Sequence, residues 1–110
     1  MSPDSAVFDL AALCGQRARS GRTYFEFLRL PAMSAGLYEI AAGAPDKQDP
    51  HREAELYYVI SGRAEFRAGS EVTAVKSGSI IFVAAGVSHR FEKIAEDLRL
   101  LVLFAPAETT

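Results

Sequence analysis

The chain has 110 residues, enough for one domain but too few for a complete TIM barrel, a protein kinase or a two-domain dehydrogenase. Its 49% hydrophobic and 24% charged residues are typical of folded globular proteins rather than of disordered or fibrous ones. The formal net charge of -2 offers no general attraction for polyanions, so we expect no nucleic-acid partner. No apolar run approaches the ~18 residues of a membrane-spanning helix, and the N-terminus lacks the basic start of a secretory signal. We therefore expect a cytoplasmic protein with no membrane partner.

Residues 1–22 are predicted to form an N-terminal arm with one short helix. Apolar residues recur at helical spacing between Asp9 and Arg19, and Asp9 is of a residue type that caps helix N-termini. The only cysteine, Cys14, lies on this segment and has no nearby histidine to activate it, so we interpret it as inert packing.

Residues 23–106 are predicted to be all-β, and we treat the whole chain as a single domain. Runs of four to eight residues rich in Tyr, Phe, Val and Ile alternate with glycine-containing breaks, a pattern typical of a sandwich or barrel. The expected strands are 23–30, 37–41, 55–60, 64–67, 72–76, 79–83, 89–94 and 98–104. The expected breaks are 34–36, 42–45, 61–62, 69–70, 77–78 and 85–88.

Two of these runs, 57–60 and 100–104, are apolar on both faces of the strand. Because successive side chains of a strand point to opposite faces, the outer face of each run needs a cover. A homodimer interface is the simplest cover. The alternative is burial under the N-terminal helix or under a loop of the same chain.

The two histidines, His51 and His89, both lie next to turns at the start of strand-like segments. Pro50 favours an extended backbone at Asp49, the residue before it. In an extended chain the side chains of Asp49, His51 and Glu55 lie on the same side. His89 would complete a set of four ligands. Two imidazoles with one or two carboxylates suit a divalent metal such as Fe(II), Mn, Ni, Co or Zn. The alternative is that each histidine is an ordinary surface or hydrogen-bonded residue.

Four further residues have alternative interpretations. Glu53 shares the parity of the candidate ligands and is either a competing ligand or a solvated loop charge. Tyr57 and Phe91 each follow a candidate ligand by two residues, so they either form an aromatic pocket wall or belong to the core. Arg29 either points inward and anchors an anionic ligand, or points outward into a surface salt bridge.

Two stretches of the chain carry a longer pattern. From Gly43 to Gly62 the sequence reads G-x5-D-x-H-x3-E-x6-G, and from Gly78 to Lys93 it reads G-x5-A-x-G-x2-H-x3-K. These stretches resemble the first and second motifs of the cupin superfamily. The resemblance implies a double-stranded β-helix, a jelly-roll barrel, with a metal site at the mouth or interior of the barrel.

The resemblance also assigns roles by position. His51, Glu55 and His89 match the motif ligands in residue type, and the spacing to the closing glycine favours Glu55 over Glu53. Asp49 stands where the family usually has its first histidine. We expect Asp49 to be the fourth ligand, or else to leave this position open to water.

The function that the resemblance implies is that of a divalent-metal-binding cupin. Such a protein would act on a small oxygenated molecule as a dioxygenase or an isomerase. Two alternatives remain: a module that binds or senses a small molecule without turning it over, and a metal-free dimeric β-scaffold.

Overall fold

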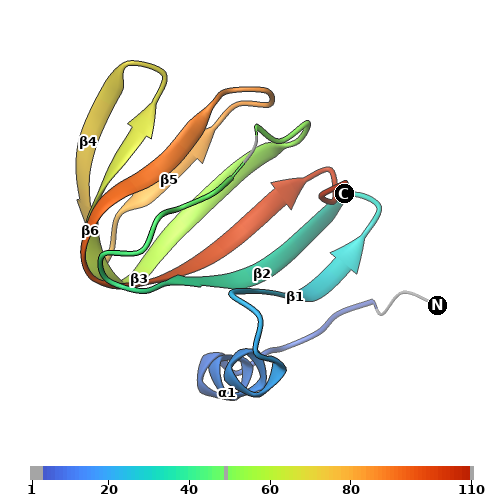
Figure 1. Cartoon of the computed structure of the whole chain (residues 1–110). Coiled ribbons are helices and arrows are strands. Elements are labelled where there is room, and N and C mark those ends of the chain that lie inside the picture. Colours follow the sequence, from blue (N-terminus) through green and yellow to red (C-terminus); the bar gives the residue numbers. More distant parts are fainter. Residues whose placement is uncertain (1–3, 49, 110) are drawn as a thin grey trace.

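The computed structural model describes residues 4–48 and 50–109, which form one helix and six strands (Figure 1). These elements are α1 (Leu10–Ser20), β1 (Tyr24–Leu30), β2 (Met33–Ile40), β3 (Ala54–Ala68), β4 (Glu71–Lys76), β5 (Ile80–Val83) and β6 (His89–Ala105).

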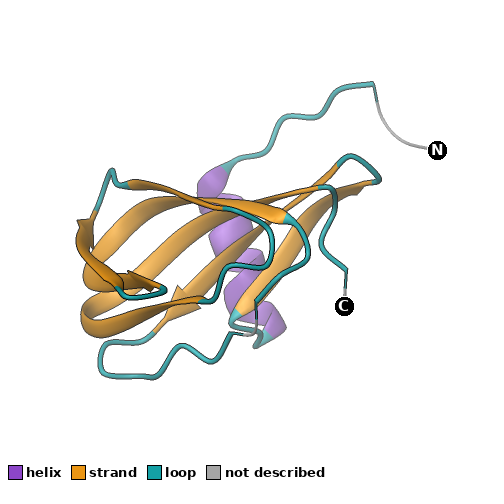
Figure 2. Ribbon diagram, turned by 90° about the horizontal axis from the view of Figure 1, so that it is seen from above, coloured by secondary structure: helices purple, strands orange, loops and turns teal. Residues whose placement is uncertain are grey.

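Helix α1 begins and ends where its capping residues dictate. The Asp9 carboxylate accepts a hydrogen bond from the Ala12 amide at 2.9 Å, and Gly21 ends the helix in the left-handed conformation, with φ of 72°. The helix packs against β1 and β2 on the outside of the sheet (Figure 2), and Leu13 is its buried side chain. Within the described part of the chain, no helix combines the length and the apolar character needed to cross a bilayer.

All strand pairings are antiparallel, in the order β1-β2-β6-β3-β4, with β5 added to β3. The two long strands, β3 and β6, pair with each other almost end to end, and their register shifts between Val59 and Glu65. Residues 55–58 of β3 also pair with β5, and residues 63–68 of β3 also pair with β4. The sheet consequently bends over on itself into an open roll (Figure 1), which is the double-stranded β-helix expected from the sequence.

The inside of the roll is filled by alternate side chains of the two long strands, as strand geometry requires. Tyr57 and Val59 of β3 and Leu98 and Leu100 of β6 belong to this core, and all four side chains are fully buried. The aromatic rings of Phe66 and Phe91, whose centroids are 5.0 Å apart, continue the core toward the end of β3. The core therefore leaves one end of the roll, near the start of β3, for polar side chains.

The prediction of eight strands was wrong in detail, because expected interruptions lie inside strands. Segments 55–60 and 64–67 are both part of β3, and segments 89–94 and 98–104 are both part of β6. Residues 34–36 lie within β2, where Ser34 and Gly36 are buried. A Cβ atom at Gly36 would meet the ring of Tyr24 at 2.5 Å, so this small residue makes room for an aromatic ring instead of forming a turn.

The outer face of the run 57–60 has different surroundings from that of β2. Leu37 of β2 is fully buried, on the strand that α1 contacts, whereas Tyr58 of β3 is 41% exposed. Cover by the N-terminal helix is therefore the wrong explanation for the run 57–60. The homodimer interface stays a prediction.

Candidate metal centre

Three candidate ligands come from different elements. His51 lies in the loop between β2 and β3, Glu55 is the second residue of β3, and His89 is the first residue of β6. Glu55 pairs with Val83, the last residue of β5. The turn after Val83 leads to His89, so it joins the neighbour of Glu55 to the second histidine. The Gly86 amide of this turn donates a 2.7 Å hydrogen bond to the His51 carbonyl, which joins the two loops.

The ligand atoms of these three residues lie within 4.8 Å of one another. His89 Nε2 is 3.0 Å from Glu55 Oε1, and His51 Nε2 is 3.9 Å from the same oxygen. The side chains of His89 and Glu55 are almost completely buried, and that of His51 is 19% exposed. The structure thus brings together residues far apart in sequence, with an edge open to solvent at His51.

The second ring nitrogen of each histidine has a partner outside the cluster. His89 Nδ1 lies 2.9 Å from the Val87 carbonyl, which can only accept a hydrogen bond, so Nδ1 carries a proton there. His51 Nδ1 lies 3.3 Å from Glu108 Oε2, in the segment after β6. Both rings are therefore held with Nε2 toward Glu55, as in metal sites where an outer partner orients the imidazole.

The donor set fits a divalent transition metal. Glu55 Oε1 is buried and, among residues 4–48 and 50–109, has no hydrogen-bond partner, although His89 Nε2 is only 3.0 Å away. A buried carboxylate oxygen without a partner is costly. A cation between the carboxylate and the two imidazoles would satisfy this oxygen, and two nitrogens with one oxygen suit a borderline metal.

The electrostatics of the site are dominated by carboxylates. Burial lowers the pKa of His89, but Glu55, the Val87 carbonyl and Asp46 outweigh it, so the pKa of His89 is raised. Burial raises the pKa of Glu108, the neighbouring Glu55 and Glu53 raise it further, and His51 partly opposes them. The surroundings favour a positive charge at the centre.

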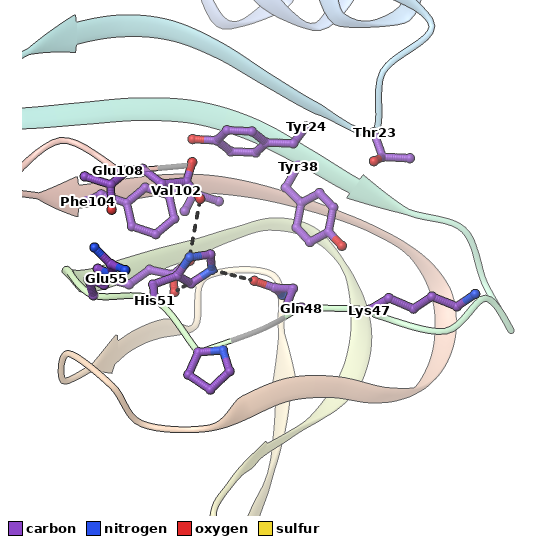
Figure 3. A pocket seen from close by; sticks show the side chains of 13 residues that line it. Thr23, Tyr24, Tyr38, Lys47, Gln48, His51, Glu55, Val102, Phe104 and Glu108 are labelled. Atoms are coloured by element: carbon purple, nitrogen blue, oxygen red, sulfur yellow. Dashed lines mark hydrogen bonds and ion pairs between the residues drawn. The ribbon is translucent and has the colours of Figure 1, made fainter.

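A cavity of about 480 Å³ adjoins the cluster and is lined by Glu55 and His51 (Figure 3). Val102 and Phe104 form an apolar part of its wall, and the Tyr24 ring lies beside them, 6.5 Å from the Phe104 ring between centroids. This volume is within the range of sites that hold small organic molecules.

The other predicted site residues have different surroundings. Tyr57 is buried and its hydroxyl reaches the cluster, 3.1 Å from His89 Nε2, whereas Phe91 packs against the Tyr57 ring within the core. Arg29 has the outward arrangement, not the inward one: its half-exposed guanidinium forms an ion pair with Glu26 and donates to the Glu108 carbonyl.

The interpretation of Glu53 as a solvated charge was wrong. Glu53 is buried, its Oε2 accepts a hydrogen bond from Thr109, and its Oε1 has no partner among the described residues. The segment after β6 covers it, which no local pattern could indicate. Asp49, the expected fourth ligand, lies outside the described residues.

Sequence reasoning missed two residues that approach the cluster. Gln48 Oε1 lies 3.3 Å from His51 Nε2, and Glu108 lies on its other side. No sequence spacing relates either residue to the histidines. The position of Gln48 depends on the path of a loop, and the position of Glu108 depends on how the C-terminal segment docks.

The fold and the three-ligand cluster define a small β-roll protein with a candidate metal site at one end. A family model for the cupin domain matches residues 36–104, well over half of the chain. The chain therefore belongs to the cupin superfamily. An uncharacterized protein of Streptomyces coelicolor, SCO3923, is 48% identical over 103 residues, which cover 94% of this chain and 98% of that protein.

Solved structures share the fold. TT1209 from Thermus thermophilus has a TM-score of 0.73 and 25% identity, and the match covers 92% of this chain and 97% of that one. KdgF from Halomonas sp. has a TM-score of 0.69, 19% identity and 76% coverage of both chains. The cupin domain of Cnp3 from Schizosaccharomyces pombe has a TM-score of 0.69 and 20% identity over 76% of this chain, but the match spans 63%, less than two thirds, of that structure.

Proposed function

We propose that this protein binds one divalent transition metal through His51, Glu55 and His89 and holds a small oxygenated molecule in the adjoining cavity. The reaction would be of the dioxygenase or isomerase type. The observation that carries the metal site is Glu55 Oε1, a buried oxygen that two Nε2 atoms approach and that has no hydrogen-bond partner in the described part of the chain. Fe(II), Mn, Ni, Co and Zn are all compatible with this donor set.

A metal bound there would act as a Lewis acid or activate dioxygen. The residues of the chain would position the ligand. The Tyr24 hydroxyl is buried, with no hydrogen-bond partner among the residues that the structure describes, and burial together with Glu108 raises its pKa. It therefore keeps its proton at neutral pH and can donate a hydrogen bond to a bound molecule. Glu108, with its raised pKa, lines the same cavity and can accept a proton from a bound molecule.

The test is metal binding by the purified protein. We expect about one transition-metal ion per chain, measured by elemental analysis after purification without a metal-affinity tag. His51→Ala and Glu55→Gln should each lower the affinity at least tenfold, because each removes a ligand atom or its charge. Circular dichroism should show that both variants stay folded, since the core lies elsewhere in the roll.

Glu96→Gln is the matched control, because Glu96 is an exposed carboxylate paired with Arg63 on the surface. It should bind metal like the wild type. Near-zero metal that is not restored by Fe(II), Mn, Ni, Co or Zn would support the metal-free scaffold instead. Metal binding without turnover of any small oxygenated compound would support the binding module.

A further inference from the structure

Gln48 is held by a buried carboxylate beside the metal centre. Its Nε2 donates a 2.7 Å hydrogen bond to Asp46 Oδ2, and the same oxygen accepts from the Phe91 amide at 2.9 Å. The other oxygen of Asp46 accepts from the Tyr38 hydroxyl at 2.7 Å. Asp46 is thus a fixed acceptor, buried to 7% exposure, inside the roll.

This arrangement determines which end of the Gln48 amide faces the centre. A carboxylate only accepts hydrogen bonds, so the NH2 group must point to Asp46 and the carbonyl oxygen must point away from it. Gln48 Oε1 accordingly lies 3.0 Å from the Tyr57 hydroxyl and 3.3 Å from His51 Nε2. In Figure 3 the side chain of Gln48 reaches toward the His51 ring.

The oxygen of Gln48 is therefore on the same side as the candidate ligand atoms. The Tyr57 hydroxyl that contacts it is also 3.1 Å from His89 Nε2. An amide oxygen has two lone pairs, so it can accept the hydrogen bond from the Tyr57 hydroxyl and still bind a cation. It is also a neutral, hard donor of the kind that Mn, Fe(II) and Co(II) accept.

We propose that Gln48 Oε1 is the fourth protein ligand of the metal centre, in the role that the sequence pattern assigns to Asp49. This inference rests on the proposed function. The set becomes two imidazoles, one carboxylate and one amide oxygen. The protein then contributes one negative charge from its ligands, not two, and the bound divalent ion keeps a net positive charge toward the cavity.

The experiment titrates the metal-free protein with Co(II) and records its affinity and its visible absorption spectrum. Gln48→Leu should weaken binding about tenfold or more, equivalent to about 1.4 kcal/mol, and should change the spectrum because the donor set changes. Gln48→Asn keeps the amide but is one methylene shorter, and it should give the same result. Tyr38→Phe is the matched control: it removes a hydrogen bond to Asp46 but no ligand atom, so affinity and spectrum should stay those of the wild type.

Each other outcome is decisive. Wild-type affinity and spectrum in Gln48→Leu, above all if Asp49→Asn weakens binding, would overturn the inference and leave the three-residue centre intact. If Tyr38→Phe lowered the Co(II) affinity and changed the spectrum as much as Gln48→Leu, the effect would come from disturbed hydrogen bonds of Asp46 and not from a lost ligand atom. That result would also overturn the inference. A wild-type protein that binds no Co(II) or other divalent metal would overturn the proposed function itself.

Discussion

The two histidines of the centre are oriented by different parts of the chain. His89 is fixed by a backbone carbonyl inside its own turn, which no side-chain substitution removes. His51 is more exposed and depends on Glu108, which comes from the far end of the chain. A single substitution at Glu108 can therefore loosen the orientation of His51.

Glu108→Ala should lower metal affinity about tenfold, the usual effect of losing the outer partner of a ligating histidine. The backbone of Glu108 would stay docked, because its amide donates to Ser34 and its carbonyl accepts from Arg29. Glu108→Gln keeps an acceptor oxygen and should lose less. The measurement is a metal titration of the purified variants.

Thr109→Val is the control for this prediction. It removes the neighbouring hydrogen bond to Glu53 and leaves the contact to His51 in place. Equal affinities for Glu108→Ala and the wild type would mean that His51 needs no outer partner. A loss as large in Thr109→Val would assign the effect to docking of the whole segment.

At the level of elements, the bend of β3 depends on Gly62. Its φ is 101°, and a Cβ atom there would lie against the Asp97 carbonyl and 2.8 Å from Leu98 Cα. The two long strands approach each other so closely at this point that only glycine fits. The bend allows the first half of β3 to carry Glu55 while the second half closes the core.

Gly62→Ala should destabilise the fold by roughly 2 kcal/mol or more, because backbone strain and a backbone clash both act there. Gly78→Ala is the matched control: Gly78 has φ of 93°, but a Cβ atom added there would meet no atom of the described residues within 4 Å. Urea denaturation followed by circular dichroism measures both variants. Equal destabilisation of the two would show that the close approach to Asp97 carries no cost.

The same residues show why the fold was predictable and its strand boundaries were not. Alternating apolar residues fix which face of a strand is buried, so an all-β roll followed from the sequence. Small residues at 34–36 and 61–62 resemble turns in a sequence, but here they accept a neighbouring ring or a neighbouring strand. Whether glycine ends a strand or bends it is decided by long-range pairing.

The candidate site divides in a similar way. His51, Glu55 and His89 lie on or beside paired strands, so their spacing predicts their meeting once the roll is assumed. Gln48 and Glu108 lie in a loop and in the C-terminal segment, whose paths are set by hydrogen bonds to Asp46, Ser34 and Arg29. Those contacts have no signature in local sequence.

For the whole molecule, the outstanding feature is an apolar strip on the outer face of β3 and β5. Leu56 pairs with Phe82 and Tyr58 with Ile80, and all four side chains are at least 39% exposed. Neighbouring exposed apolar side chains of this size are typical of interaction sites. We expect a second copy of the chain to cover this strip.

Ile80→Lys combined with Phe82→Lys should weaken dimerisation roughly a hundredfold or more, since each buried side chain contributes about 1.5–3 kcal/mol. Sedimentation equilibrium would then show a monomer where the wild type is a dimer. Val72→Lys, on β4, is the control for adding a charge at a partly exposed apolar position. A monomeric wild type, or a double variant that stays dimeric, would contradict the assignment of this strip.

The most direct test of the proposed metal centre is a crystal structure of the metal-loaded protein, with anomalous diffraction measured at the absorption edge of the bound metal. We expect one strong peak about 2.0–2.2 Å from the Nε2 atoms of His51 and His89 and from a Glu55 oxygen. An ion bound elsewhere in the protein would contradict the proposed centre. So would a fully metal-loaded protein in which the two imidazoles share no ion.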